Sequence, residues 1–171
     1  IKHVVEQNKS ARFIIIGGSS KEIESKTKCL EKRGVADRVD FLGKISPDLL
    51  PDYLAASDIL LSPRISGVNS PLKLLDYLKT GRAIVATDLE SNRVILSPEN
   101  AVLTVPEPEK MASAIVDLIN DPEKREVLGN TGHELYRKKY NFREYSRLLS
   151  QCYTFVHEKK KSKKRNTVPM L

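Results

Sequence analysis

Short apolar segments, each closed by turn residues, alternate with helical patterns through most of the chain. The clearest is Phe13–Ile16, a β-branched run that is followed at once by Gly17 and Gly18. Apolar runs without polar alternation are typical of strands buried on both faces of a parallel sheet. We therefore expect strands over 12–16, 38–42, 59–61, 83–86 and 101–105.

Helical periodicity fills the intervals between these strands, over 23–32, 48–57 and 72–80. Parallel strands need crossovers of a dozen or more residues, so this alternation predicts the α/β class, with a Rossmann-like parallel sheet and helices on both faces. Three further helices are expected at the C-terminal end, as a cover. They begin behind Pro108, at Pro122 and at Asn141.

The charge is unevenly spread along the chain. The 171 residues carry a formal net charge of +7, with 29 Lys and Arg against 22 Asp and Glu, and Glu158–Arg165 holds most of the excess. The remainder is too nearly neutral to coat nucleic acid. We expect one Rossmann-like domain over 1–157 and a basic, disordered tail over 158–171, able to touch an anionic membrane.

Cysteine and hydropathy patterns exclude several classes of protein. Cys29 and Cys152 lack the spacing of metal or redox motifs, so we expect two buried thiols, no disulfide and no metal. No apolar run reaches the length needed to cross a bilayer, and the first residues do not resemble a signal peptide. A cytoplasmic protein is expected.

Ligands of open parallel sheets bind beyond the carboxyl ends of the strands. Gly17 and Gly18 lie at such a place, between a strand and a helix. This pair is neither a Walker loop nor a dinucleotide fingerprint. It predicts either a backbone that approaches an anion or a tight strand-to-helix turn.

The segment 62–81 carries the strongest candidate anion site. A polar loop runs into a helix start at Pro71, and helix N-termini attract anions. Lys73 lies in the first turn, where the helix dipole disfavours a cation unless an anion neutralises it. Asp76 follows one turn later, so the two side chains could hold phosphate and sugar hydroxyls; an exposed Lys–Asp pair is the alternative. The loop also contains Gly67, Asn69 and Ser70.

In this order, the segments resemble the C-terminal, nucleotide-sugar-binding domain of GT-B glycosyltransferases, of the kind called glycosyltransferases group 1 or family 4. The resemblance covers residues 10–155 and rests on the order of several landmarks rather than on one motif. The landmarks are Phe13–Gly17, Val39–Gly43, Leu54–Asp58, Ser62–Pro63, Pro71–Leu78, Gly81 and Ile84–Asp88.

The resemblance implies a role for each candidate residue. Gly17 and Gly18 would line the donor cleft, and the loop Gly43-Lys44-Ile45 would lie against the nucleobase. The diphosphate of a nucleotide diphosphate sugar would sit at the helix start formed by Ser70, Pro71, Leu72 and Lys73, with help from Arg64. Lys73 would be the catalytic residue, acting electrostatically on the departing phosphate without a metal, and Asp76 would bind the ribose.

The chain departs from the family pattern at two places. Val68 stands where retaining members carry a Glu, which leaves the stereochemistry of transfer open. Family domains open with a strand that ends in Gly-Arg, and the first residues here, Ile1–Gln7, predict the helix that follows that strand. We expect this strand to be central and absent here, so that the chain is a fragment that lacks an N-terminal acceptor domain, binds its donor weakly and does not catalyse.

Two other functions are consistent with the sequence. A non-catalytic α/β interaction module would use the glycines structurally and the basic tail to recruit a membrane or nucleic acid. A sugar-nucleotide epimerase would share donor binding but require additional acid–base groups at the cleft. Asp88 follows a strand end, where it could bind a sugar; we expect it to cap the next helix.

Overall fold

The computed structural model describes the backbone of residues 1–165 and the side chains of residues 1–160. It divides into two compact units, 1–133 and 134–171, each described by itself below. The expected domain runs through residue 157, whereas the boundary between these units falls inside the helix Pro122–Lys139.

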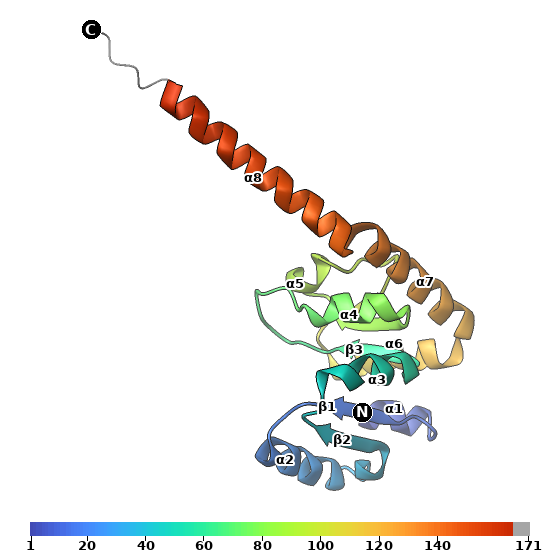
Figure 1. The fold of residues 1–171 in the computed structure, drawn as a ribbon. Coiled ribbons are helices and arrows are strands. Elements are labelled where there is room, and N and C mark those ends of the chain that lie inside the picture. Colours follow the sequence, from blue (N-terminus) through green and yellow to red (C-terminus); the bar gives the residue numbers. More distant parts are fainter. Residues whose placement is uncertain (166–171) are drawn as a thin grey trace. The chain divides into compact units, whose positions relative to one another are not determined.

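The elements follow the predicted alternation, with boundaries shifted by a few residues (Figure 1). The strands are β1 (Phe13–Ile16), β2 (Val39–Gly43), β3 (Ile59–Ser62), β4 (Ala83–Thr87) and β5 (Val102–Thr104). The α-helices are α1 (Lys2–Gln7), α2 (Ser20–Glu31), α3 (Leu50–Ala56), α4 (Lys73–Thr80), α5 (Glu90–Arg93), α6 (Pro108–Asn120), α7 (Pro122–Lys139) and α8 (Phe142–Arg165). Short 3-10 turns cover Ala36–Arg38 and Pro47–Leu49.

Every strand pairing is parallel, which confirms the predicted α/β class. The strands form two sheets rather than one, with orders β1-β2 and β3-β4-β5. Within the described residues, β1 therefore pairs on one edge only, and so does β3. The expected central strand would have to lie between these two edges.

The core is built around β4, which is buried at every position. Ala83 and Val85 lie in one cluster with Ile115 and Leu118 of α6. Ile84 is fully buried too, and alternation along the strand turns it to the opposite face. The strand is thus covered on both sides, as a central strand of a parallel sheet must be.

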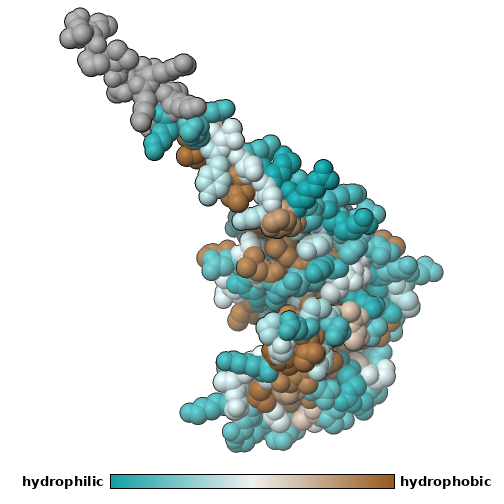
Figure 2. Space-filling model, in the orientation of Figure 1, coloured by the Kyte–Doolittle hydropathy of each residue, from teal (hydrophilic) through white to brown (hydrophobic). Residues whose placement is uncertain are grey.

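β1 contrasts with β4, because its middle residues are not covered. Ile14 and Ile15 are 49% and 36% exposed, although Phe13 packs against the core cluster that includes Val85. Figure 2 shows hydrophobic residues at the surface of the part of the chain that holds β1 and β2, in the lower half of the view. Exposed β-branched side chains on a strand that is paired at one edge only mark an incompletely covered sheet edge.

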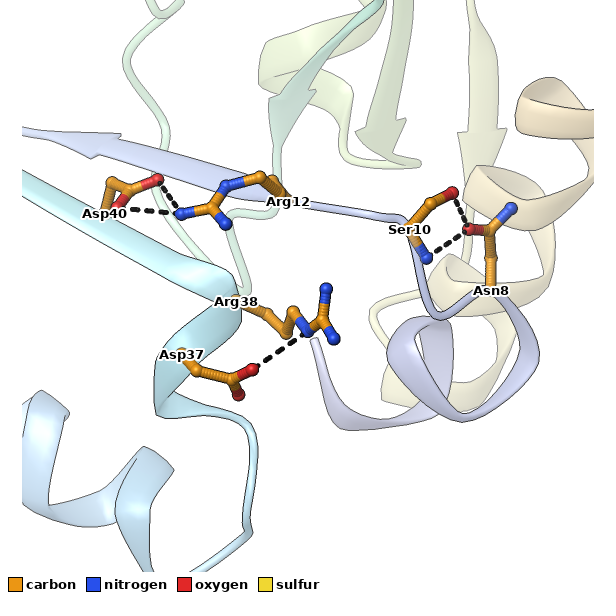
Figure 3. Close-up of polar contacts among 6 residues, drawn as sticks. All are labelled: Asn8, Ser10, Arg12, Asp37, Arg38 and Asp40. Atoms are coloured by element: carbon orange, nitrogen blue, oxygen red, sulfur yellow. Dashed lines mark hydrogen bonds and ion pairs between the residues drawn. The ribbon is translucent and has the colours of Figure 1, made fainter.

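β1 and β2 are joined at both ends. At the amino end, Nη2 of Arg12 lies 2.9 Å from Oδ2 and 3.2 Å from Oδ1 of Asp40 (Figure 3). At the carboxyl end, the amide of Gly17 donates to the carbonyl oxygen of Gly43 at 2.6 Å. The second bond lies at the edge where a ligand of a parallel sheet would bind.

The second unit differs from the expected C-terminal cover. α8 continues to Arg165, so residues 158–165 are helical rather than disordered, whereas 166–171 lie outside the described residues. Its apolar side chains, among them Tyr145 and Tyr153, are exposed. Cys152 and, in the first unit, Cys29 are exposed free thiols, so the prediction that they are buried is wrong.

Candidate functional site

The loop that contains Gly17 and Gly18, predicted to line a donor cleft, lies beside the loop Gly43-Lys44-Ile45, predicted to contact the nucleobase. Gly17 and Gly18 have φ values of 100° and 88°, and Gly43 has φ 61°, conformations that side chains with a Cβ rarely adopt. The hydrogen bond from Gly17 to Gly43 brings these loops together. Lys44, just beyond, is exposed, and Ile45 is half-buried.

The start of α2 is already occupied by a carboxylate of the chain. Ser19 is the N-cap, and Oε2 of Glu22 accepts from the Ser19 amide and hydroxyl, both at 2.8 Å. These hydrogen bonds lower the pKa of Glu22 and keep it ionised. The Glu22 carboxylate would repel an anionic ligand at the start of α2. The capped turn therefore favours the interpretation of Gly17 and Gly18 as a tight strand-to-helix turn.

The start of α4 is different, because no side chain caps it. The loop 63–72 leads into this helix, with Ser70 and Pro71 half-buried and Leu72 exposed. Lys73 and Leu74 follow as the first two helical residues. The amides of Leu74 and Leu75 donate to the carbonyl oxygens of Pro71 and Leu72, at 3.0 and 2.9 Å, but no side chain competes with an anion for this helix start.

Lys73 is held at the end of β3. Its Nζ lies 3.5 Å from the carbonyl oxygen of Leu61 and 5.5 Å from the ring centroid of Tyr77. The Tyr77 hydroxyl donates to the same Leu61 carbonyl at 3.2 Å. Partial burial of the ammonium lowers the pKa of Lys73, and the positive charge of Arg64 lowers it further.

Asp76 makes none of the ion pairs found in the described residues, so the alternative of an exposed Lys73–Asp76 pair is not realised. Asp76 is exposed in the first turn of α4. Burial of the phenol, and then the Asp76 carboxylate, raise the pKa of Tyr77. Lys73 and Asp76 therefore remain separately available to a ligand.

The structure brings in residues that the sequence did not single out. Tyr77 contacts the same carbonyl as Lys73, a pairing that requires the end of β3 to lie beside α4. Asn92 is fully buried and donates to the Thr87 carbonyl oxygen at 2.8 Å, behind the carboxyl ends of β3 and β4. The role of Tyr77 could have been inferred from the sequence only by its spacing, since it lies one helical turn after Lys73.

Asp88 does not cap the next helix, contrary to expectation. The N-cap of α5 is Leu89, without a side-chain hydrogen bond. The Asp88 carboxylate instead accepts from Arg93, with Nη2 at 2.7 Å and Nε as a second donor. The guanidinium lowers the pKa of Asp88, so this exposed pair is charged at neutral pH.

Among residues 1–160, no group of three or more His, Cys, Asp and Glu side chains could hold a metal ion. No helix among the described residues is long and apolar enough to cross a membrane.

The chain belongs to the family of glycosyl transferases group 1, whose sequence pattern matches residues 1–121. It is 22% identical over 156 residues to the gpi3 subunit of phosphatidylinositol N-acetylglucosaminyltransferase from Schizosaccharomyces pombe, covering 91% of this chain and 34% of that protein. It is 26% identical over 121 residues to the phosphatidyl-myo-inositol mannosyltransferase of Mycolicibacterium smegmatis, covering 67% of this chain and 31% of the relative. The chain thus spans about a third of the length of these curated relatives.

Solved structures of similar fold are GT-B glycosyltransferases. Sucrose-phosphate synthase from Thermosynechococcus elongatus matches with a TM-score of 0.80 and 20% identity, covering 92% of this chain and 41% of the synthase. The Anabaena protein HepE, crystallised in complex with UDP, matches with a TM-score of 0.81 and 18% identity, covering 90% of this chain and 43% of HepE. These similarities confirm the predicted fold family.

Proposed function

We propose that this chain is the donor-binding half of a glycosyltransferase that takes a sugar from a nucleotide diphosphate sugar. The observation that carries the proposal is the uncapped start of α4 beside Lys73, which makes no ion pair among the described residues. Helix-end amides and a nearby ammonium suit a diphosphate. That HepE was crystallised with UDP supports this ligand class.

The other candidate residues complete a donor site in this proposal. The loop Gly43-Lys44-Ile45 contacts the base through its backbone, Gly17 and Gly18 let the donor approach the sheet edge, and Asp76 accepts hydrogen bonds from the ribose. Asp76 is exposed and makes no ion pair with any residue whose side chain the structure describes, which is consistent with that role.

Lys73 acts electrostatically in the proposed reaction. When the bond between sugar and diphosphate breaks, negative charge develops on the departing phosphate oxygen. The Lys73 ammonium and the amides at the start of α4 stabilise the charge on that oxygen, so the proposed reaction requires no metal. The sugar passes to an acceptor held by a separate domain, and the chain by itself is inactive. A hexose is the sugar we expect to be transferred.

The basic segment suggests where the acceptor lies. Two relatives are named for transfer to phosphatidylinositol or phosphatidyl-myo-inositol. We propose that the basic C-terminal residues hold the enzyme at an anionic membrane surface on the cytoplasmic side. Lysines and arginines near such a surface contribute about 1 kcal/mol each.

Titration calorimetry of UDP, GDP and ADP tests donor binding. The intact enzyme is expected to bind one of them, and the 171-residue chain alone to bind it weakly. In hydrogen exchange, that nucleotide should protect residues 65–73 of the intact enzyme. Absence of binding by any of the three would contradict the proposal and favour the non-catalytic interaction module.

A further inference from the structure

Arg64 turns inward, unlike its neighbours in the loop that precedes α4. Ile65 and Val68 are 79% and 93% exposed, whereas Arg64 is half-buried. Its Nη1 donates to the carbonyl oxygen of Asn69 at 2.7 Å. The side chain therefore connects Arg64 to Asn69 and closes the part of the loop between these two residues.

Gly67 lies directly against this guanidinium. A Cβ at Gly67 would lie 2.1 Å from Nη2 and 3.0 Å from Cζ of Arg64. Gly67 also has φ 126°, in a region that side chains rarely adopt. A side chain at residue 67 would thus have to displace the Arg64 guanidinium and adopt an unfavourable φ.

The closed loop leads into the candidate anion site. Asn69, which accepts the hydrogen bond, is separated from Lys73 by Ser70, Pro71 and Leu72. The carbonyl oxygen of Pro71 accepts from the Leu74 amide at 3.0 Å, so the loop passes without interruption into the first turn of α4. Fixing the carbonyl of Asn69 thus fixes the direction from which the chain enters that turn.

We propose that Arg64 is a positioning residue that holds the start of α4 and Lys73 in place for an anion. Its guanidinium does so by bonding to the Asn69 carbonyl and lying against Gly67, two contacts that together we call the brace. This differs from the expectation that Arg64 assists by touching the diphosphate. The consequence for anion binding rests on the proposed function, whereas the brace itself does not.

Loop cleavage tests the brace without any ligand. In the intact enzyme, native-state digestion with proteinase K should cut within 65–69 about tenfold faster in Arg64→Ala and in Gly67→Ala than in the wild type, because a released loop opens more often. Gly34→Ala is the matched control, since Gly34 also has positive φ but no heavy atom near the position of a Cβ. Wild-type cleavage rates in Arg64→Ala would overturn the proposal.

A double-mutant cycle tests the link to anion binding. Arg64→Ala and Gly67→Ala are each expected to weaken the affinity for the preferred nucleoside diphosphate about tenfold. The double variant should lose less than the two single losses combined, because the contact between a Cβ at residue 67 and Arg64 no longer exists once Arg64 is removed, whereas the strain of the positive φ remains. A hundredfold loss in the double variant would show independent roles and contradict the brace.

The two measurements separate this proposal from the proposed function. If the enzyme binds no nucleoside diphosphate but cleavage responds as expected, the brace stands and the donor site does not. If Arg64→Ala weakens nucleotide binding while its loop resists cleavage like the wild type, Arg64 is a direct ligand. That result overturns the brace and retains the donor site.

Discussion

Lys73 is the residue on which the candidate site depends. It begins a helix, where its charge opposes the macrodipole, and partial burial and Arg64 both disfavour its ammonium form. An anion would relieve all three effects at once. The Lys73 ammonium is therefore destabilised in the free protein and stabilised when an anionic ligand binds.

Replacing Lys73 tests this account directly. Lys73→Ala in the intact enzyme should weaken nucleoside diphosphate binding by about 1.5 to 3 kcal/mol, the scale of a charge-assisted hydrogen bond. Lys79→Ala, in the last turn of the same helix, removes an equal charge away from the site and should leave the affinity unchanged. Calorimetry that finds equal affinities for Lys73→Ala and the wild type would remove Lys73 from the site.

The pH dependence of binding follows from the same residue. Because the pKa of Lys73 is lowered in the free protein, its ammonium is lost at a lower pH than the model-compound value of 10.5. Below the lowered pKa the charge is present and the nucleotide binds; above it the charge is lost and the affinity falls. In Arg64→Ala, which removes one cause of the shift, this fall should move to higher pH. Calorimetric titrations across the alkaline range measure the change, and an unmoved midpoint would contradict it.

At the scale of elements, the contact between α7 and the end of α4 depends on a glycine. A Cβ at Gly129 would lie 2.0 Å from the carbonyl oxygen of Gly81, the residue that ends α4 with φ 69°. His133, one turn further along α7, has Nδ1 2.8 Å from the Lys79 carbonyl oxygen. At Gly129 the backbone of α7 therefore lies so close to the backbone of Gly81 that no side chain fits between them.

Gly129→Ala should consequently destabilise the protein. An alanine within a helix ordinarily gains up to about 1 kcal/mol over glycine. Here the alanine Cβ would clash with the backbone of Gly81, which cannot move aside. The substitution should therefore destabilise the protein and lower its free energy of unfolding by about 1 to 3 kcal/mol. Thr131→Ala, an exposed position in the same helix, is the control and should change it by less than about 0.5 kcal/mol. Urea denaturation that finds Gly129→Ala stabilising would refute the close approach.

The open edges of β1 and β3 carry a second prediction at this scale. We expect an extended segment of the intact enzyme to pair with both, since each presents unpaired backbone groups and Ile14 and Ile15 lie exposed beside them. Amides over 13–16 should then exchange more slowly in the intact enzyme than in the 171-residue chain. Equal exchange rates would show that no strand is added there.

At the scale of the whole molecule, the second unit is dominated by one long helix. α8 exposes an apolar series that includes Tyr145 and Leu149, and Figure 2 shows hydrophobic residues along it. Its last turns hold the basic segment. Within the described part of this unit, the charge lies on a helix rather than on the disordered tail that composition suggested.

Removing that charge should affect membrane association. Deleting residues 159–165 is expected to weaken binding of the intact enzyme to vesicles that contain anionic lipid, and added salt should weaken wild-type binding similarly. Vesicles of purely zwitterionic lipid are the control, where deletion should change nothing. Cosedimentation that finds equal binding to anionic vesicles would refute the membrane role.

Local patterns determined which elements form. The apolar runs at 13–16 and 83–87 are strands, the periodic segments are helices, and the order of landmarks along the sequence is that of the family to which the chain belongs. The α4 start was also found from sequence, because helix boundaries and dipoles depend on residues near one another in the chain. Its assignment as a diphosphate site remains a prediction.

Only the tertiary structure decided what each candidate side chain contacts. The bond from Gly17 to Gly43, the position of Lys73 against the Leu61 carbonyl and the division of the strands into two sheets all join residues distant in sequence. The exposure of Cys29 and of the apolar face of α8 was missed for the same reason. Propensity and periodicity depend on neighbours along the chain, whereas burial and hydrogen-bond partners depend on which distant segments meet.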